Sequence, residues 1–216
     1  MNIIILGQQG SGKGTQAEIL AQKFDLIHID MGKTLREVAK ADTPLGREIY
    51  AIQNVTKTLV PSRILREVLH FKLNSIPREQ GIVFDGVPRA IDQAEYIEEA
   101  LLEFGRKIDA VFFINISEDE AIKRISKRWV CKECRAVFIR GKDVKNEQDR
   151  CSQCSGELTQ RMDDTVSGIK KRLQVFNLET MPVINYFKGK GLLVEIAGEQ
   201  SVEKVSEEIV KILDKK

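Results

Sequence analysis

A glycine-rich segment near the start of the chain has the residue types that hold a polyphosphate. Residues 7–15 read Gly-Gln-Gln-Gly-Ser-Gly-Lys-Gly-Thr, directly after the apolar run Ile3–Leu6 and directly before a helical pattern. Glycines let backbone N–H groups converge on phosphate oxygens, and the N-terminus of the following helix adds its dipole. We expect Lys13 to reach the β- and γ-phosphates. Gly14 stands where the general pattern has Ser or Thr, so Thr15 is predicted to supply the hydroxyl for a magnesium ion.

A carboxylate near that magnesium ion is expected from a second apolar run. Residues 82–85 read Ile-Val-Phe-Asp, which is typical of a buried strand that ends in an acidic side chain. Strand-end aspartates hold hydrated magnesium next to phosphate loops. We therefore predict that Asp85 helps to hold the ion.

The four cysteines form two close pairs, Cys131-x2-Cys134 and Cys151-x2-Cys154. This spacing is typical of a structural tetrathiolate zinc site, in which four thiolates leave no position open for catalysis. The zinc would fold a small segment that has little core beyond Trp129 and Phe138. Two disulfides, four free thiols or a tetrathiolate iron site are the alternatives.

The elements that must position these groups alternate between short apolar runs and helical patterns. Nearly continuous apolar strands of this kind are expected in a parallel sheet with helices on both faces, so the fold class is α/β, doubly wound. Two stretches break the alternation: residues 30–61, mostly helical by pattern, and residues 127–164, which contain the cysteines. The core is then 1–29, 62–126 and 165–216. The predicted strands are Ile3–Leu6, Leu26–Ile29, Ile82–Phe84, Ala110–Ile114 and Leu192–Ile196.

Composition limits the class of protein. The chain has 216 residues, of which 42% are hydrophobic and 31% charged, and its formal net charge is +2. These values are typical of a globular protein and argue against a dedicated nucleic-acid binder. No apolar run approaches the length that spans a membrane, and no export signal is recognised, so we expect a cytoplasmic protein without membrane partners. With two histidines, His28 and His70, a multi-histidine metal site is not expected.

Together these motifs carry a resemblance. The chain resembles the adenylate kinase family of nucleoside monophosphate kinases essentially from end to end, and the cysteine segment is similar to the zinc-containing long lid of some members. The resemblance implies a P-loop NTPase-like core with a five-stranded sheet, a monophosphate-binding insertion at 30–61, a zinc lid at 127–164, and a monomer. It is carried by residues 10–16 and 85–89, Gly32, Leu35-Arg36, Gln93, Arg124, Arg128, residues 161–164 (Arg-Met-Asp-Asp) and residues 171–173 (Lys-Arg-Leu).

The activity implied by the resemblance is reversible, magnesium-dependent transfer of the γ-phosphate of ATP to AMP, giving two ADP, for nucleotide homeostasis. Several arginines suit that reaction because two anionic nucleotides must be neutralised where water is excluded. The implied ATP-binding residues are Gly10, Ser11, Gly12, Lys13, Gly14, Thr15, Arg124 and Arg128. The implied AMP-binding residues are Met31, Gly32, Arg36, Gly86, Arg89, Gln93, Arg161 and Arg172. The implied catalytic residues are Lys13, Arg89, Arg124, Arg128, Arg161 and Arg172. The implied cofactors are Mg²⁺ with ATP, at Thr15 and Asp85 partly through water, and structural Zn²⁺ at the four cysteines.

The acceptor region departs from the family pattern. Residues 30–33 read Asp-Met-Gly-Lys where the family commonly has Ser-Thr-Gly-Asp, so a thioether replaces a hydroxyl near the acceptor. Another nucleoside monophosphate kinase, which takes CMP, UMP or GMP, is therefore the nearest alternative, and Gln93 and the long cysteine segment oppose it. A zinc-ribbon nucleic-acid-binding adaptor on an inactive core is the alternative from a different class.

Overall fold

The core of the molecule is one parallel sheet. The structure is a computed structural model that describes residues 1–56, 60–134, 136–146, 148–160 and 164–215. The strands lie in the order β2-β3-β1-β4-β8, which confirms the predicted α/β fold class and all five predicted strands. Their bounds are β1 (Asn2–Leu6), β2 (Leu26–Asp30), β3 (Gly81–Asp85), β4 (Ala110–Asn115) and β8 (Leu193–Ala197).

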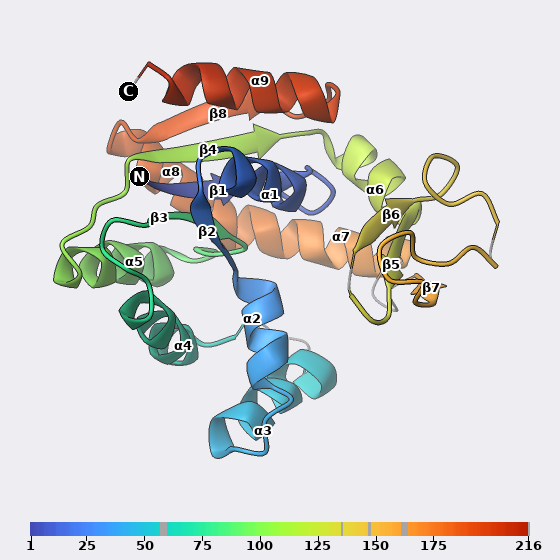
Figure 1. Cartoon of the computed structure of the whole chain (residues 1–216), viewed down its shortest axis with the longest axis horizontal. Coiled ribbons are helices and arrows are strands. Elements are labelled where there is room, and N and C mark those ends of the chain that lie inside the picture. The colour runs from blue at the N-terminus through green and yellow to red at the C-terminus, as the bar shows by residue number, and fades with distance from the viewer. Residues whose placement is uncertain (57–59, 135, 147, 161–163, 216) are drawn as a thin grey trace.

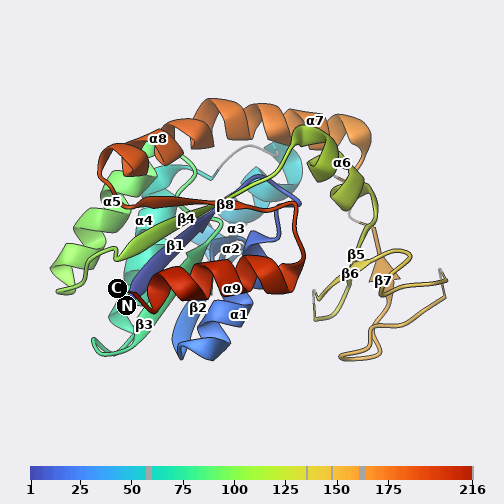
Figure 2. The same ribbon diagram turned by 90° about the horizontal axis from the view of Figure 1, so that it is seen from above.

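Helices cover both faces of the sheet (Figures 1 and 2). On one face Ile3 and Ile5 pack with α1 (Lys13–Lys23) and α9 (Val202–Leu213). On the other face Ile4 and Leu6 pack with α4 (Ser62–Asn74), α5 (Ile91–Glu103) and α8 (Met181–Gly189). Successive side chains of a strand point to opposite faces, so a strand buried on both sides must be apolar throughout. All five residues of β1 are accordingly buried.

The segment 30–61, called the helical segment below, leaves the sheet at the end of β2. It contains α2 (Met31–Val38), α3 (Pro44–Ala51) and a π-helical turn, η1 (Ile52–Thr56). Side-chain oxygens cap both α-helices: Asp30 accepts a hydrogen bond from the N–H of Lys33, and Thr43 from that of Gly46. Figure 1 shows α2 and α3 projecting from the sheet at the bottom of the view.

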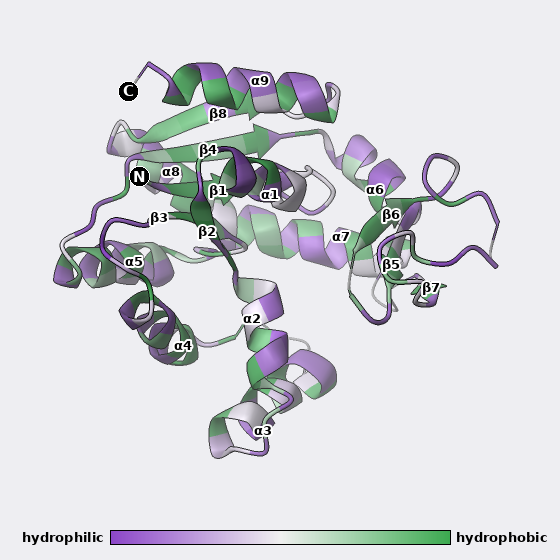
Figure 3. Cartoon of the chain, viewed as in Figure 1, coloured by the Kyte–Doolittle hydropathy of each residue, from purple (hydrophilic) through white to green (hydrophobic). Residues whose placement is uncertain are grey.

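The segment 127–164, called the cysteine segment, follows α6 (Glu118–Ser126). It forms a second, antiparallel sheet in the order β6-β5-β7, from β5 (Arg128–Cys131), β6 (Val137–Ile139) and β7 (Leu158–Thr159). Trp129 and Phe138 are register partners and belong to a small buried cluster, which confirms the predicted core. Figure 3 shows that the loops around this sheet are largely hydrophilic. The sheet therefore has few apolar side chains to bury.

A long helical rod returns from the cysteine segment along the main sheet (Figure 2). It consists of α7 (Val166–Val175), a second π-helical turn, η2 (Phe176–Thr180), and α8. After β8, the side-chain oxygen of Ser201 accepts a hydrogen bond from the N–H of Lys204 and caps α9, whose buried face is Val205, Ile209 and Leu213. None of the helices within the described ranges has the length and apolar character needed to cross a bilayer.

Candidate active site and metal centre

The loop between β1 and α1 has the backbone of an anion-binding nest. Gly10 and Gly12 have φ values of 85° and 89°, in the left-handed region where glycine is favoured. Ser11 is buried, and its Oγ has no hydrogen-bond partner within the described part of the chain. The N–H of Gln16 donates to the carbonyl of Gly12 at 3.0 Å and so starts α1. The loop is therefore shaped for an anion at a helix N-terminus.

Asp85 lies against this loop at the carboxyl end of β3. A Cβ on Gly14 would lie 3.1 Å from Oδ2 of Asp85, so a larger residue at position 14 would crowd the carboxylate. The residue is 7% exposed, and its Oδ1 accepts no hydrogen bond from the described residues. A buried carboxylate oxygen without a partner fits the predicted magnesium role. Thr15, the predicted hydroxyl ligand, is exposed in the first turn of α1.

The electrostatics join Lys13 to groups from several elements. Burial lowers the pKa of Lys13, and the charge of Asp85 opposes that shift, while Arg89 and Arg128 add to it. Burial by itself would raise the pKa of Asp85, but the His28 imidazole and the charge of Lys13 outweigh burial and lower it. Nε2 of His28 lies 3.8 Å from Oδ2 of Asp85. Lys13 therefore lies within the electrostatic field of two arginines, Arg89 and Arg128.

Two glycines bring two arginines together at the acceptor side. A Cβ on Gly32 would lie 3.2 Å from Nη1 of Arg36, and one on Gly86 would lie 3.5 Å from Nη2 of Arg89. The Cβ on Gly86 would also lie 3.9 Å from the backbone nitrogen of Gly32. Two guanidinium groups thus flank one pair of glycines, an arrangement suited to a phosphate group.

Met31 and Gln93, both predicted to bind the acceptor, have buried side chains. Met31 is 2% exposed and packs in the core at the start of α2, so its thioether fills core space. Gln93 is buried, and its Oε1 accepts a hydrogen bond from the N–H of Arg89 at 2.8 Å. The Gln93 carboxamide therefore fixes the backbone of the acceptor arginine.

Arg124 connects the phosphate loop to neighbouring elements. Its Nη1 donates to the carbonyl of Gly10 at 3.4 Å, and its Nη2 to that of Gly198 at 2.9 Å. Glu120, one turn earlier in α6, accepts a hydrogen bond from its Nε at 2.8 Å. Arg124 thus lies against the phosphate loop.

Arg128 and Arg172 share one carboxylate. Arg128 donates to both oxygens of Asp164, at 2.9 and 2.6 Å, and Nη2 of Arg172 donates to Oδ1 at 2.7 Å. The Asp164 side chain is 1% exposed, so the group is a nearly buried triad of two cations and one anion. Arg161, predicted to bind AMP and to act in catalysis, lies outside the described residues.

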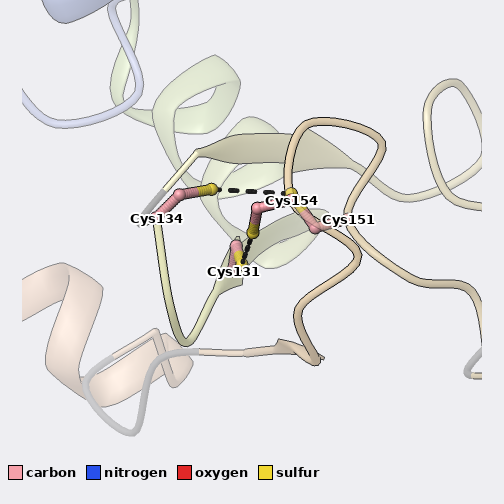
Figure 4. A group of neighbouring side chains, drawn as sticks. All are labelled: Cys131, Cys134, Cys151 and Cys154. Carbon is pink, nitrogen blue, oxygen red and sulfur yellow. Dashed lines mark hydrogen bonds between the residues drawn. The ribbon is translucent and has the colours of Figure 1, made fainter.

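The four cysteines converge as their spacing predicts (Figure 4). Their sulfur atoms all lie within 4.8 Å of one another, and all four thiols are free of disulfide bonds. Burial would raise the pKa of Cys131, but backbone N–H groups of Cys134 and Glu133 donate to its sulfur and lower the pKa to about 7. A Cβ on Gly156 would lie 2.7 Å from Sγ of Cys131, so any larger residue at this position would collide with the sulfur cluster. Four converging thiols without disulfides fit one tetrahedral metal ion.

Sequence reasoning missed two of the groups at this site. His28 belongs to an apolar run that carries no functional motif, yet it lies beside Asp85. The signal was the sheet itself, because β2 and β3 pair in register up to Asp30 and Asp85, and His28 lies near that end. Asp164 belongs to a motif that was used for the family resemblance without a role of its own.

Comparison with known proteins agrees with this geometry. A sequence model of the family described as adenylate kinase matches residues 5–192. An adenylate kinase of Caldicellulosiruptor bescii is 40% identical over 213 residues, which are 99% of each chain. An adenylate kinase of Archaeoglobus fulgidus is 37% identical over 215 residues, 100% of this chain and 99% of the relative. The chain therefore belongs to the adenylate kinase family and is a nucleoside monophosphate phosphotransferase.

Proposed function

We propose that the chain transfers the γ-phosphoryl group of Mg-ATP to AMP, reversibly and with two ADP as products, at the site around Lys13. One observation supports this most: Lys13 lies in the field of Arg89 from the acceptor side and of Arg128 from the cysteine segment, with Asp85 beside the loop. Phosphoryl transfer needs that pattern, because charge on three phosphate groups must be neutralised along one line.

On the donor side, the nest of residues 10–15 holds the ATP phosphates, with Lys13 on the β- and γ-phosphates. Thr15 and Asp85 would hold the magnesium ion that accompanies ATP, partly through water, and the ion would neutralise charge on the phosphates. The buried Oδ1 of Asp85, which has no hydrogen-bond partner among the described residues, supports this assignment. Arg124, which is fixed to the carbonyl of Gly10, lies over the same loop.

On the acceptor side, Arg36 and Arg89 bind the AMP phosphate between Gly32 and Gly86. The contacts of both guanidinium groups with these glycines support the assignment. Gln93, predicted to bind AMP, is assigned to the adenine, because the second lone pair of its Oε1 can accept a hydrogen bond while its amide N–H groups donate. Met31 contributes its backbone there, because its side chain is in the core.

The chemical step needs positioning and charge rather than a side-chain nucleophile. An oxygen of the AMP phosphate attacks the γ-phosphorus in line as the bond to the ADP leaving group breaks. Arg128 and Arg172, with Arg161, neutralise the transferring group, and we assign no general base. Asp164 orients two of these arginines before nucleotide binds.

The cysteine segment acts as a lid over ATP, and zinc is the proposed metal at Cys131, Cys134, Cys151 and Cys154. Bound zinc would supply fold stability, since four thiolates close its coordination sphere. A rigid lid closes as a unit, excludes water and so suppresses hydrolysis of ATP. The proposal keeps the division into core (1–29, 62–126 and 165–216), monophosphate-binding segment (30–61) and lid (127–164). It also keeps a cytoplasmic monomer that binds neither nucleic acid nor membrane.

The proposal is tested by measuring ADP formation from Mg-ATP with AMP, CMP, UMP or GMP as the acceptor. AMP should give the highest kcat/KM, by about ten-fold or more, because recognition of one base edge by hydrogen bonds discriminates strongly. Preference for another base would overturn the acceptor assignment and leave the transfer chemistry intact. An absence of turnover with all four acceptors would overturn both.

A further inference from the structure

The hydroxyl of Thr180 makes a hydrogen bond that has no part in the proposed binding of either nucleotide. Thr180 lies in η2 of the long helical rod and is 6% exposed. Its Oγ1 donates to the carbonyl of Arg89 at 3.1 Å, across 91 residues of sequence. A buried hydroxyl of the rod thus holds the backbone of the proposed acceptor arginine.

The backbone of Arg89 is held on both sides of its Cα. Oε1 of Gln93 accepts the N–H of Arg89 at 2.8 Å, while Thr180 donates to its carbonyl. The side chain is fixed as well, because Nε donates to the carbonyl of Gly86 at 2.9 Å. The direction in which the guanidinium leaves the backbone is therefore set by groups from two separate elements.

A threonine inside a helix can donate to the carbonyl of residue i−4 of its own helix. Thr56 in η1 does so, donating to the carbonyl of Ile52 at 3.1 Å. Thr180 occupies the same last position of the other π-helical turn, yet its hydroxyl donates to a different element. The hydroxyl of Thr180 therefore serves a contact between two elements rather than its own helix.

The rod that carries Thr180 also carries Arg172. Arg172 lies in α7, which runs directly into η2, and Figures 1 and 2 show α7 and α8 as one rod along the sheet. The rings of Phe176 in η2 and Phe113 in β4 stack with centroids 6.4 Å apart, which anchors this part of the rod to the sheet. A rod fixed there sets Arg89 in a defined position relative to Arg172.

We propose that Thr180 is a positioning residue for the transfer reaction: through its hydrogen bond to the Arg89 carbonyl, it aligns the arginine of the acceptor phosphate with Arg172. This inference rests on the proposed acceptor role of Arg89. Thr180 acts through the acceptor arginine, so its loss should affect AMP far more than ATP.

The test compares Thr180→Val, which keeps the shape and removes the donor, with Thr180→Ser, which keeps the donor. Loss of one neutral hydrogen bond corresponds to about a five-fold change. Thr180→Val should therefore raise KM for AMP or lower kcat/KM for AMP by about five-fold, with KM for ATP unchanged, and Thr180→Ser should stay close to the wild type. Ile209→Val is the matched control, because it removes one buried methyl group on the opposite face of the sheet and should lower the melting temperature without changing the AMP kinetics.

Three results would overturn the inference: wild-type AMP kinetics in Thr180→Val, equal changes in KM for AMP and ATP, or the same AMP defect in Ile209→Val. Arg89→Ala in the same assay separates a failure of this inference from a failure of the proposed acceptor role of Arg89. If Arg89→Ala keeps the wild-type KM for AMP, the acceptor role of Arg89 is wrong and the inference falls with it. If Arg89→Ala is defective while Thr180→Val behaves as the wild type, the inference alone is wrong.

Discussion

Arg128 and Asp164 form a two-point ion pair at the base of the cysteine segment, with N–O distances of 2.9 and 2.6 Å. Paired hydrogen bonds of this kind fix the plane of a guanidinium as well as its position. Arg172 reaches the same carboxylate from α7, so two arginines proposed for the transferring phosphate are held side by side before nucleotide arrives. Preorganised charge is what phosphoryl transfer demands of a protein.

Substitution of Asp164 should destabilise the fold. Asp164→Asn keeps the shape but removes the negative charge that two nearly buried arginines share. We expect the free energy of unfolding to fall by about 3 kcal/mol, because a buried charge loses its partner. Urea denaturation measures this. Glu157→Gln is the control, since its ion pair with Lys132 is exposed and should contribute less than about 1 kcal/mol. Equal losses in the two variants would contradict the buried triad.

The activity should have an alkaline limb set by Lys13. Burial lowers the pKa of Lys13, although the charge of Asp85 opposes that shift. The ammonium therefore loses its proton at a lower pH than an ordinary lysine, whose pKa is about 10.4. The charged form binds phosphate and is present below this pKa. We therefore expect kcat/KM for ATP, which reports on the free enzyme, to fall with rising pH before an ordinary lysine would lose its proton. Lys13→Arg, which keeps its charge, should show lower activity without that limb. An identical limb in both enzymes would assign the titration to another group.

Metal removal should affect stability more than turnover. Four thiols lie within 4.8 Å around a cluster with few buried apolar residues, so the metal must supply much of the local stability. We expect removal of the metal with a strong chelator to lower the melting temperature by at least about 5 °C. The metal-free protein, freed of chelator and assayed with excess Mg²⁺, should keep most of its turnover at moderate temperature. Scanning calorimetry and the ADP assay measure the two effects. A melting curve unchanged by chelation would show that the cysteines are not a structural metal site.

Gly156→Ala should weaken metal binding specifically. The added Cβ would lie 2.7 Å from Sγ of Cys131 and 3.2 Å from Sγ of Cys154, which forces at least one sulfur to move. We expect the metal content of the purified protein to fall below about half of the wild-type value, since closed tetrahedral sites tolerate little displacement. Gly189→Ala in α8 is the control, because its Cβ would meet nothing within 4 Å. Wild-type metal content in Gly156→Ala would exclude the predicted sulfur arrangement.

The strands and the phosphate loop were predictable because their signals are local. An apolar run such as Ile3–Leu6 followed by a glycine loop has one consistent structure, and the cysteine spacing itself predicts four converging thiols. The partners of the site side chains are set by tertiary contacts far apart in sequence, and no periodicity reports them. The sequence therefore indicated neither the Asp164 triad nor the buried position of Met31. Gln93 shows the same limit, since its hydrogen bond to Arg89 depends on how the backbone enters α5.

Phosphoryl transfer to AMP is measured most directly by ³¹P NMR of a mixture of Mg-ATP and AMP with the wild type and with Lys13→Ala. The wild type should convert the two nucleotides into ADP until equilibrium is reached, and should do the reverse from ADP alone. Lys13→Ala should slow both directions by about a thousand-fold while keeping the melting temperature, because the cation on the transferring phosphate is lost. ADP formation at the wild-type rate in Lys13→Ala, or none in the wild type, would contradict the assignment of this site.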